Sequence, residues 1–96
     1  MGKASRQKPE RLGAKLVQIR EALGLSQNEM IKHLGLTDVV SRNNLSVYES
    51  GKREPSLLVL LRYARAVKIA LEILVDDELD LPKTLPALAR LKKGRF

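Results

Sequence analysis

Two stretches of this chain, GLSQNEM at residues 24–30 and LSVYESGKREPS at residues 45–56, contain the start and stop signals of short consecutive helices. In the first, Ser26 stands where a helix would begin and Glu29 follows three residues later, which is the pattern of a capping box. In the second, Gly51 ends one helix and Ser56, directly after Pro55, begins the next. Two short helices in tandem on a basic chain predict a helix-turn-helix that places its second helix against DNA.

The composition limits the fold to one small domain. The chain has 96 residues, of which 44% are apolar and only 3% aromatic, so its core must consist mainly of Leu, Ile, Val and Ala. This composition favours an all-α fold over a β-sandwich. The formal net charge of +7 and the isoelectric point of about 10.1 favour a polyanionic partner.

The residue content also excludes several kinds of site. The chain has no Cys, so it forms neither disulfides nor thiolate–metal sites. An enzyme is not expected, because the chain has a single His, no pair of carboxylates on a predicted cleft wall and no Gly-rich phosphate loop. We expect no metal and no cofactor, since the acidic run at residues 76–80 lacks the spaced ligands of a calcium loop.

No segment predicts a membrane protein or a secreted one. None approaches the roughly 20 apolar residues of a membrane span. The N-terminus lacks the apolar core of a secretory signal. The expected location is the cytoplasm, in association with the nucleoid.

Apolar spacing and capping residues predict five helices. Leu12, Leu16, Ile19 and Leu23 recur at helical spacing until Gly24 stops the pattern. The later helices are expected over residues 26–35, 42–50 (capped by Ser41), 56–67 and 71–76, with residues 36–40 as a loop. The core face of the fourth helix is expected to comprise Leu57, Leu60, Leu61, Ala64 and Val67.

The expected division of the chain has three parts. Residues 1–9 form a disordered basic arm and residues 10–76 form the helix-turn-helix DNA-binding domain. Residues 77–96 form a flexible tail, in which residues 84–93 can form one short amphipathic helix that is marginal by itself.

The span from about Leu12 to Val75 resembles the phage-repressor and Cro-like (xenobiotic-response-element type) family of helix-turn-helix transcriptional regulators. The resemblance rests on IREALGLSQ at residues 19–27, LSVYESG at residues 45–51 and KREPSL at residues 52–57. It implies a compact five-helix domain like that of lambda repressor, which binds an inverted-repeat operator in double-stranded DNA as a homodimer. Regulation of transcription, usually repression, is implied in the same way.

The resemblance places the candidate DNA contacts in three groups. Gln27 falls at the start of the second helix, where the family often contacts a phosphate and where the helix dipole favours an anion. The positions that face base edges are occupied by Arg42, Asn43, Ser46 and Val47, with Asn44 as a further candidate. The loop that commonly touches the DNA backbone contains Lys52 and Arg53.

These residue types suit their roles, although each also has a structural interpretation. An Asn amide matches the N6/N7 edge of adenine, and Arg42 can read guanine or clamp a phosphate. Val47 can meet a thymine methyl group or pack on its own domain, while the Asn residues and the basic loop can simply be solvated. Leu45 and Tyr48 are expected in the core. Glu49 is expected to pair or cap locally.

One feature departs from the family pattern. The separation from Gly35 to Glu49 is about four residues longer than the family's short turn allows. The additional residues, Thr37 to Val40, form either a bulged loop or an added turn of the third helix. Phosphates would repel Asp38, so the loop is expected to point away from DNA or to read a cytosine amino group.

A second set of apolar residues predicts an interface. Their number exceeds what one small domain needs to cover, and a contiguous exposed apolar patch usually marks an interface. We interpret this set as a homodimer surface on the fourth and fifth helices, the alternative being that the C-terminal tail folds back over it. The set comprises Leu58, Val59, Ile69 and Ile73.

Three functions from different classes compete. The leading hypothesis is a sequence-specific DNA-binding transcription regulator that acts as a homodimer. The second keeps the same domain in the antitoxin of a toxin–antitoxin pair, with the C-terminal segment binding a toxin. The third is a protein-interaction adaptor without DNA specificity.

Overall fold

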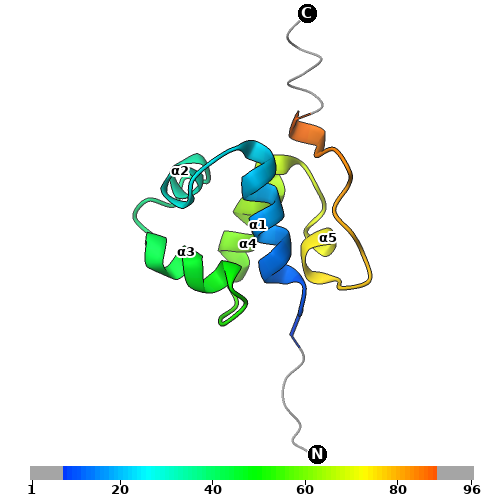
Figure 1. Ribbon diagram of the computed structural model, residues 1–96, viewed down its shortest axis with the longest axis horizontal. Helices are drawn as coiled ribbons and strands as arrows, with labels where there is room; N and C mark the ends of the chain where they lie inside the picture. Colours follow the sequence, from blue (N-terminus) through cyan, green and yellow to red (C-terminus); the bar gives the residue numbers. More distant parts are fainter. Residues whose placement is uncertain (1–7, 89–96) are drawn as a thin grey trace, which may run out of the picture.

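The computed structural model describes residues 8–88 and shows five α-helices, with no strand in that range (Figure 1). The helices are α1 (Leu12–Leu23), α2 (Gln27–His33), α3 (Arg42–Glu49), α4 (Leu57–Val67) and α5 (Leu71–Val75). Helix α1 contacts both α3 and α5, while α2 packs against α3 and α4 against α5. The prediction of an all-α, five-helix fold is confirmed. Most of the predicted arm at residues 1–9 lies outside the described residues.

Three serines begin α2, α3 and α4. Ser26 accepts a hydrogen bond from the backbone N–H of Glu29 at 3.1 Å, and the Glu29 carboxylate accepts one from the Ser26 N–H at 2.8 Å. Ser41 and Ser56 accept from the N–H three residues further on, at 3.1 and 3.3 Å. Each bond satisfies an N–H that has no partner within its helix, so the predicted caps and the capping box are confirmed.

The core is built from all five helices and from two segments outside them. Leu57, predicted on the core face of α4, is instead 75% exposed. It is the first residue of α4, and helical side chains lean toward the N-terminus, so its side chain projects past the packed face. The buried apolar residues are Leu12, Leu16, Ile19, Met30, Ile31, Leu34, Leu36, Val40, Leu45, Val59, Leu60, Tyr63, Ala64, Val67, Leu74 and Leu85.

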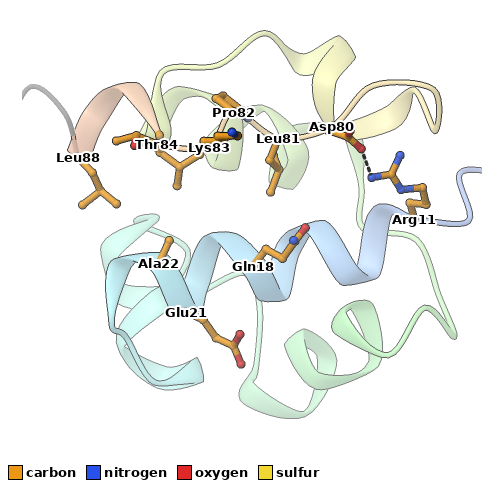
Figure 2. Close-up of a pocket in the computed structure, with 11 residues that line it drawn as sticks. Arg11, Gln18, Glu21, Ala22, Asp80, Leu81, Pro82, Lys83, Thr84 and Leu88 are labelled. Atoms are coloured by element: carbon orange, nitrogen blue, oxygen red, sulfur yellow. Dashed lines mark hydrogen bonds and ion pairs between the residues drawn. The ribbon is translucent and has the colours of Figure 1, made fainter.

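The start of α1 is capped by a residue from the other end of the chain. Helix α1 begins after Arg11, which makes no side-chain cap of its own. Instead, the Asp77 carboxylate accepts hydrogen bonds from the backbone N–H groups of Glu10 at 2.9 Å and Arg11 at 3.0 Å. The Arg11 guanidinium in turn donates to the Asp77 carbonyl at 2.6 Å and pairs with Asp80 (Figure 2).

Residues 77–88 form a strap that packs along α1. Leu85 is buried in the core, and Leu81 and Leu88 pack against it. Pro86 starts a helical turn, and most of the helix predicted at residues 84–93 lies outside the described range. The packed unit therefore extends beyond residue 76, the predicted domain boundary. An open groove of about 640 Å³ lies between the strap and α1 (Figure 2).

The hydrogen bonds accepted by Asp77 make the stability of the folded domain depend on pH. Its hydrogen bonds from Glu10 and Arg11 hold the pKa of Asp77 below its usual value. A depressed folded-state pKa gives stability that is fully present above the unfolded pKa of about 3.9 and is lost as pH falls through the folded value.

We therefore expect Asp77→Ala to be less stable than the wild type at neutral pH, with a difference that shrinks as acid protonates the wild-type carboxyl. Asp77→Asn keeps one acceptor for the N–H groups of Glu10 and Arg11, so it should lose less stability. Urea unfolding followed by circular dichroism over a pH series measures both effects. Equal stability of Asp77→Ala and wild type at neutral pH would show that the strap does not cap α1.

Candidate nucleic-acid interface

Helix α3 has one face in the core and one in solvent. Leu45 is only 1% exposed and Tyr48 is half-buried against the core, as the spacing predicts. Arg42, Asn43 and Ser46 lie on the opposite, exposed face. Within residues 8–88, the structure gives the side chains of Arg42 and Asn43 no hydrogen-bond or ion-pair partner. Their donors and acceptors are therefore available to another molecule.

The two remaining candidates on α3 are half-buried. Val47 is partly covered, and it contributes an apolar edge to the solvent face. Asn44 accepts a hydrogen bond from the Arg53 guanidinium at 3.3 Å through its side-chain oxygen. The amide NH₂ of Asn44 remains a donor, whereas its acceptor is already engaged.

Glu49, the last residue of α3, joins three helices. Its carboxylate accepts two hydrogen bonds from the Arg20 guanidinium of α1, at 2.8 and 3.1 Å. It also accepts one from the side-chain amide of Gln27, the first residue of α2, at 3.0 Å. The Glu49 side chain is 5% exposed and that of Arg20 18%, so this is a largely buried, bidentate pair. Glu49 thus pairs across 29 residues of sequence rather than locally.

Arg20 is fixed at both ends of its guanidinium. Besides Glu49, it donates to the Leu25 carbonyl at 3.0 Å, in the turn that leads into α2. Its hydrogen bonds to the Glu49 carboxylate raise the pKa of Arg20, so the guanidinium stays charged. The position of Arg20 four residues after Leu16, on the apolar face of α1, is the sequence signal for a buried partner.

Gln27, predicted to contact a phosphate, is half-buried and held by Glu49. Its side-chain nitrogen carries two hydrogens, and one bond to Glu49 uses one of them. The second remains available to a phosphate oxygen. The phosphate contact therefore stays a prediction that this geometry allows.

A close backbone contact holds the other end of α3. A Cβ atom on Gly13 of α1 would lie 2.8 Å from the Glu49 carbonyl oxygen and 3.0 Å from both the Tyr48 carbonyl oxygen and the Gly51 nitrogen. Glycine therefore lets α1 touch the end of α3 with no side chain between them. Sequence reasoning missed this position, because a glycine inside a helix carries no signal of which backbone it meets.

The basic loop follows directly. Gly51 has φ of 81°, in the left-handed region, and its N–H bonds to the Tyr48 carbonyl at 3.1 Å while the Lys52 N–H bonds to the Val47 carbonyl at 3.2 Å. This ending of α3 leaves the side chains of Lys52 and Arg53 exposed beside the C-terminal end of α3.

The additional residues before α3 form a turn, not a longer helix. Leu36 and Val40 are buried, at 1% and 4% exposure, while Thr37, Asp38 and Val39 between them are exposed. The Leu36 carbonyl accepts hydrogen bonds from the N–H groups of Val39 and Val40, both at 2.9 Å. Helix α3 begins only after this turn, at Arg42.

The exposed apolar residues on α4 differ from those predicted for the dimer surface. Leu58 is 53% exposed, as an interface residue should be, whereas Val59 is 2% exposed and belongs to the core. Val59 lies one residue, about 100°, around α4, which turns it inward. Ile69 and Ile73 are half-buried, with Ile69 packed against the core. Leu57 adds to the exposed apolar area beside Leu58.

The described part of the chain offers neither a metal site nor a membrane span. Residues 8–88 contain no group of three or more metal-ligating side chains that could hold an ion. Over the same range, no helix combines the length and apolar character needed to span a bilayer. The groove between the strap and α1 lies on the other side of α1 from α3 (Figures 1 and 2).

A short exposed polar helix, fixed at its end to two others and followed by a basic loop, defines a DNA-binding helix-turn-helix domain. A family model described as Helix-turn-helix matches residues 16–74, more than half of the chain. The protein therefore belongs to this family, in its Cro/C1 type, as its sequence resemblance implied. The family is one of DNA-binding regulators and not a catalytic one. Comparisons with curated proteins and with solved structures give no match.

Removing the Glu49 carboxylate should destabilise the domain strongly. Glu49→Ala leaves Arg20 and Gln27 without their acceptor in a largely buried site, so we expect a loss of about 3 kcal/mol in the free energy of unfolding. Glu49→Gln keeps an uncharged acceptor and should lose less. Urea unfolding measures both.

The exposed Glu21 on α1 provides the control, since Glu21→Ala should change stability by less than about 0.5 kcal/mol. If Glu49→Ala cost no more than about 1 kcal/mol, the pair would behave as a surface salt bridge and would not fix α3.

Proposed function

We propose that this protein is a sequence-specific transcription regulator that binds an inverted repeat in double-stranded DNA as a homodimer and represses transcription by occupying a promoter. Membership of the helix-turn-helix family supports DNA binding and transcription regulation in general. The observation that carries the proposal is the solvent face of α3, where Arg42 and Asn43 have no side-chain partner among residues 8–88. A regulator of this kind acts on the chromosome, so the proposal includes association with the nucleoid.

Base reading is assigned to the first half of α3. The Arg42 guanidinium can donate to both O6 and N7 of guanine, and the Asn43 amide can pair with N6 and N7 of adenine. Ser46 lies one turn further along the same exposed face, within reach of either kind of base edge. Val47 supplies an apolar contact at the edge of this face.

Phosphate binding is assigned to the groups on either side of α3. Lys52 and Arg53 are exposed in the loop after it, and Gln27 keeps one amide hydrogen at the start of α2. Contacts to phosphates set the register of a protein on the duplex and make its affinity depend on salt. The net charge of +7 favours this kind of association.

Dimerisation is assigned to the exposed start of α4. Leu57 and Leu58 are adjacent and exposed, at 75% and 53%, and burying them against a second copy removes apolar area from water. In a two-fold dimer, the two α3 helices would enter successive major grooves about 34 Å apart.

The two alternative functions receive no specific support. A toxin-binding C-terminal segment would have to use residues 77–96, and the described part of these, residues 77–88, is engaged with α1. An adaptor without DNA specificity leaves the exposed polar face of α3 without a role.

The direct test is selection of bound duplexes from a random pool at a stated salt concentration. We expect enrichment of a palindromic sequence whose half-sites are spaced by about one helical turn. Recovery of unrelated sequences, with equal affinity for all of them, would refute sequence-specific regulation.

Single substitutions should distinguish the residues that contact bases from those that contact phosphates. Asn43→Ala or Arg42→Ala should weaken binding to the selected duplex by about 1–3 kcal/mol and relax its preference at one base pair. Lys52→Ala should weaken binding to matched and scrambled duplexes alike and reduce the slope of log affinity against log salt by about one unit.

The control is Lys83→Ala, which removes the same charge from the exposed strap on the other side of α1. It should leave both affinities close to those of the wild type. An Asn43→Ala variant that bound both duplexes like the wild type would show that α3 does not read bases.

A charge at the start of α4 should separate the two subunits. Leu58→Asp places a carboxylate in the proposed dimer contact, where burial without a partner is unfavourable. We expect sedimentation to show a monomer, with loss of cooperative binding to the palindrome. Ala14→Asp, at an exposed position of α1, should leave the dimer intact. If the Leu58→Asp variant still sedimented as a dimer, the interface would lie elsewhere.

A further inference from the structure

The turn at residues 37–39 is anchored at both ends next to the start of α3. Leu36 and Val40 anchor it in the core, at 1% and 4% exposure. The N–H groups of Val39 and Val40 share the Leu36 carbonyl, both at 2.9 Å. The tip of the turn therefore has a fixed position relative to Arg42, the first residue of α3.

The tip of this turn carries an apolar side chain in solvent. Val39 is 60% exposed, although both of the apolar residues that flank the turn are buried. A β-branched side chain has little rotational freedom, so little of its entropy is lost when it is covered. An exposed valine on an anchored turn is therefore suited to a contact made with another molecule.

The turn directly precedes the half of α3 to which base reading is assigned, so a duplex bound there would lie within its reach. The connection between α2 and α3 lies at the end of α3 that is distant from α1 (Figure 1). Arg42 lies three positions after Val39, so their Cα atoms are at most about 11 Å apart. With about 3.4 Å per base pair, this Cα separation corresponds to about three base pairs, so we expect Val39 to meet the duplex about that far from the pair that Arg42 reads.

The chemistry of the turn selects the feature of the duplex. Residues 37–41 include no Lys or Arg, and Asp38 is negative, so the turn is not suited to phosphates. In the major groove, the thymine 5-methyl group is the apolar feature that a side chain can contact.

We propose that Val39 is a specificity-determining residue that contacts the 5-methyl group of a thymine at the edge of each half-site. This inference rests on the proposed DNA-binding function and extends the reading surface beyond α3. The pre-helix turn then gives this chain a base preference that a domain with a shorter turn lacks.

The test replaces thymine by deoxyuridine, which lacks only the methyl group, one position at a time in the selected duplex. The wild type should lose about four-fold in affinity at one thymine, as expected for one buried methyl group. That position should lie within about three base pairs of the pair at which Arg42→Ala relaxes specificity. Val39→Ala should bind the thymine and deoxyuridine duplexes equally at that position.

Two further variants serve as controls for the chemistry and the position of the side chain. Val39→Thr keeps the shape of the side chain and one of its two γ-methyl groups, so it should keep more of the preference than Val39→Ala. Val75→Ala removes the same atoms from an exposed valine on α5 and should keep the wild-type response to deoxyuridine. Circular dichroism confirms that each variant is folded.

The outcomes separate this inference from the proposed function. If the wild type selects a palindrome but Val39→Ala keeps the full wild-type response to deoxyuridine, the inference is wrong and the function stands. The inference is also wrong if Val39→Ala changes the sedimentation of the free protein, because the turn would then contact a second copy. If the wild type selects no sequence, the proposed function itself fails.

Discussion

The carboxylate of Glu49 is the point at which the positions of three helices are set together. It receives the Arg20 guanidinium from α1 and the Gln27 amide from α2, and it is itself the last residue of α3. A small core of aliphatic side chains is tolerant of small rotations, since dispersion contacts have little directionality. Charge-assisted hydrogen bonds are directional, so this network specifies the orientation of α3 relative to α2. A helix that reads base edges requires such an orientation to be fixed.

Helix α1 connects α3 to the rest of the domain through contacts on two of its sides. At one point it touches the end of α3 through Gly13, where the backbones meet without an intervening side chain. On its other side, Lys15 is 1% exposed and donates to the carbonyls of Ile73 and Asp76 at 2.7 and 2.9 Å, which ties α1 to the end of α5. Burial lowers the pKa of Lys15, and these two carbonyls compensate for its lost hydration.

Local signals in the sequence were sufficient for the elements but not for their connections. Ser26 and Ser56 cap helices because their hydroxyl groups act within three residues, and that range is visible in sequence. The cap of α1 by Asp77 acts across 67 residues, so no local pattern predicts it. In the same way, the spacing of α4 suggested a patch containing Val59, but the width of the buried stripe depends on which helices surround it.

The solvent-exposed face of α3 was predictable for a similar reason. The exposure of Arg42, Asn43 and Ser46 follows from helical periodicity once the cap at Ser41 is known, because Leu45 must face the core. Their assignment as DNA contacts came from the family resemblance alone. The partners of Glu49 did not follow, since an acidic residue at a helix end has many possible neighbours. The conformation of the turn before α3 depends on two core contacts, which only the packed structure defines.

The central claim is that the outer face of α3 enters the major groove. Dimethyl sulfate footprinting on the selected duplex tests it directly, because the reagent methylates guanine N7 in the major groove and adenine N3 in the minor groove. We expect protection of guanine N7 in two half-sites about one helical turn apart, with adenine N3 unprotected. Protection of adenine N3 alone, or of neither position, would contradict the claim.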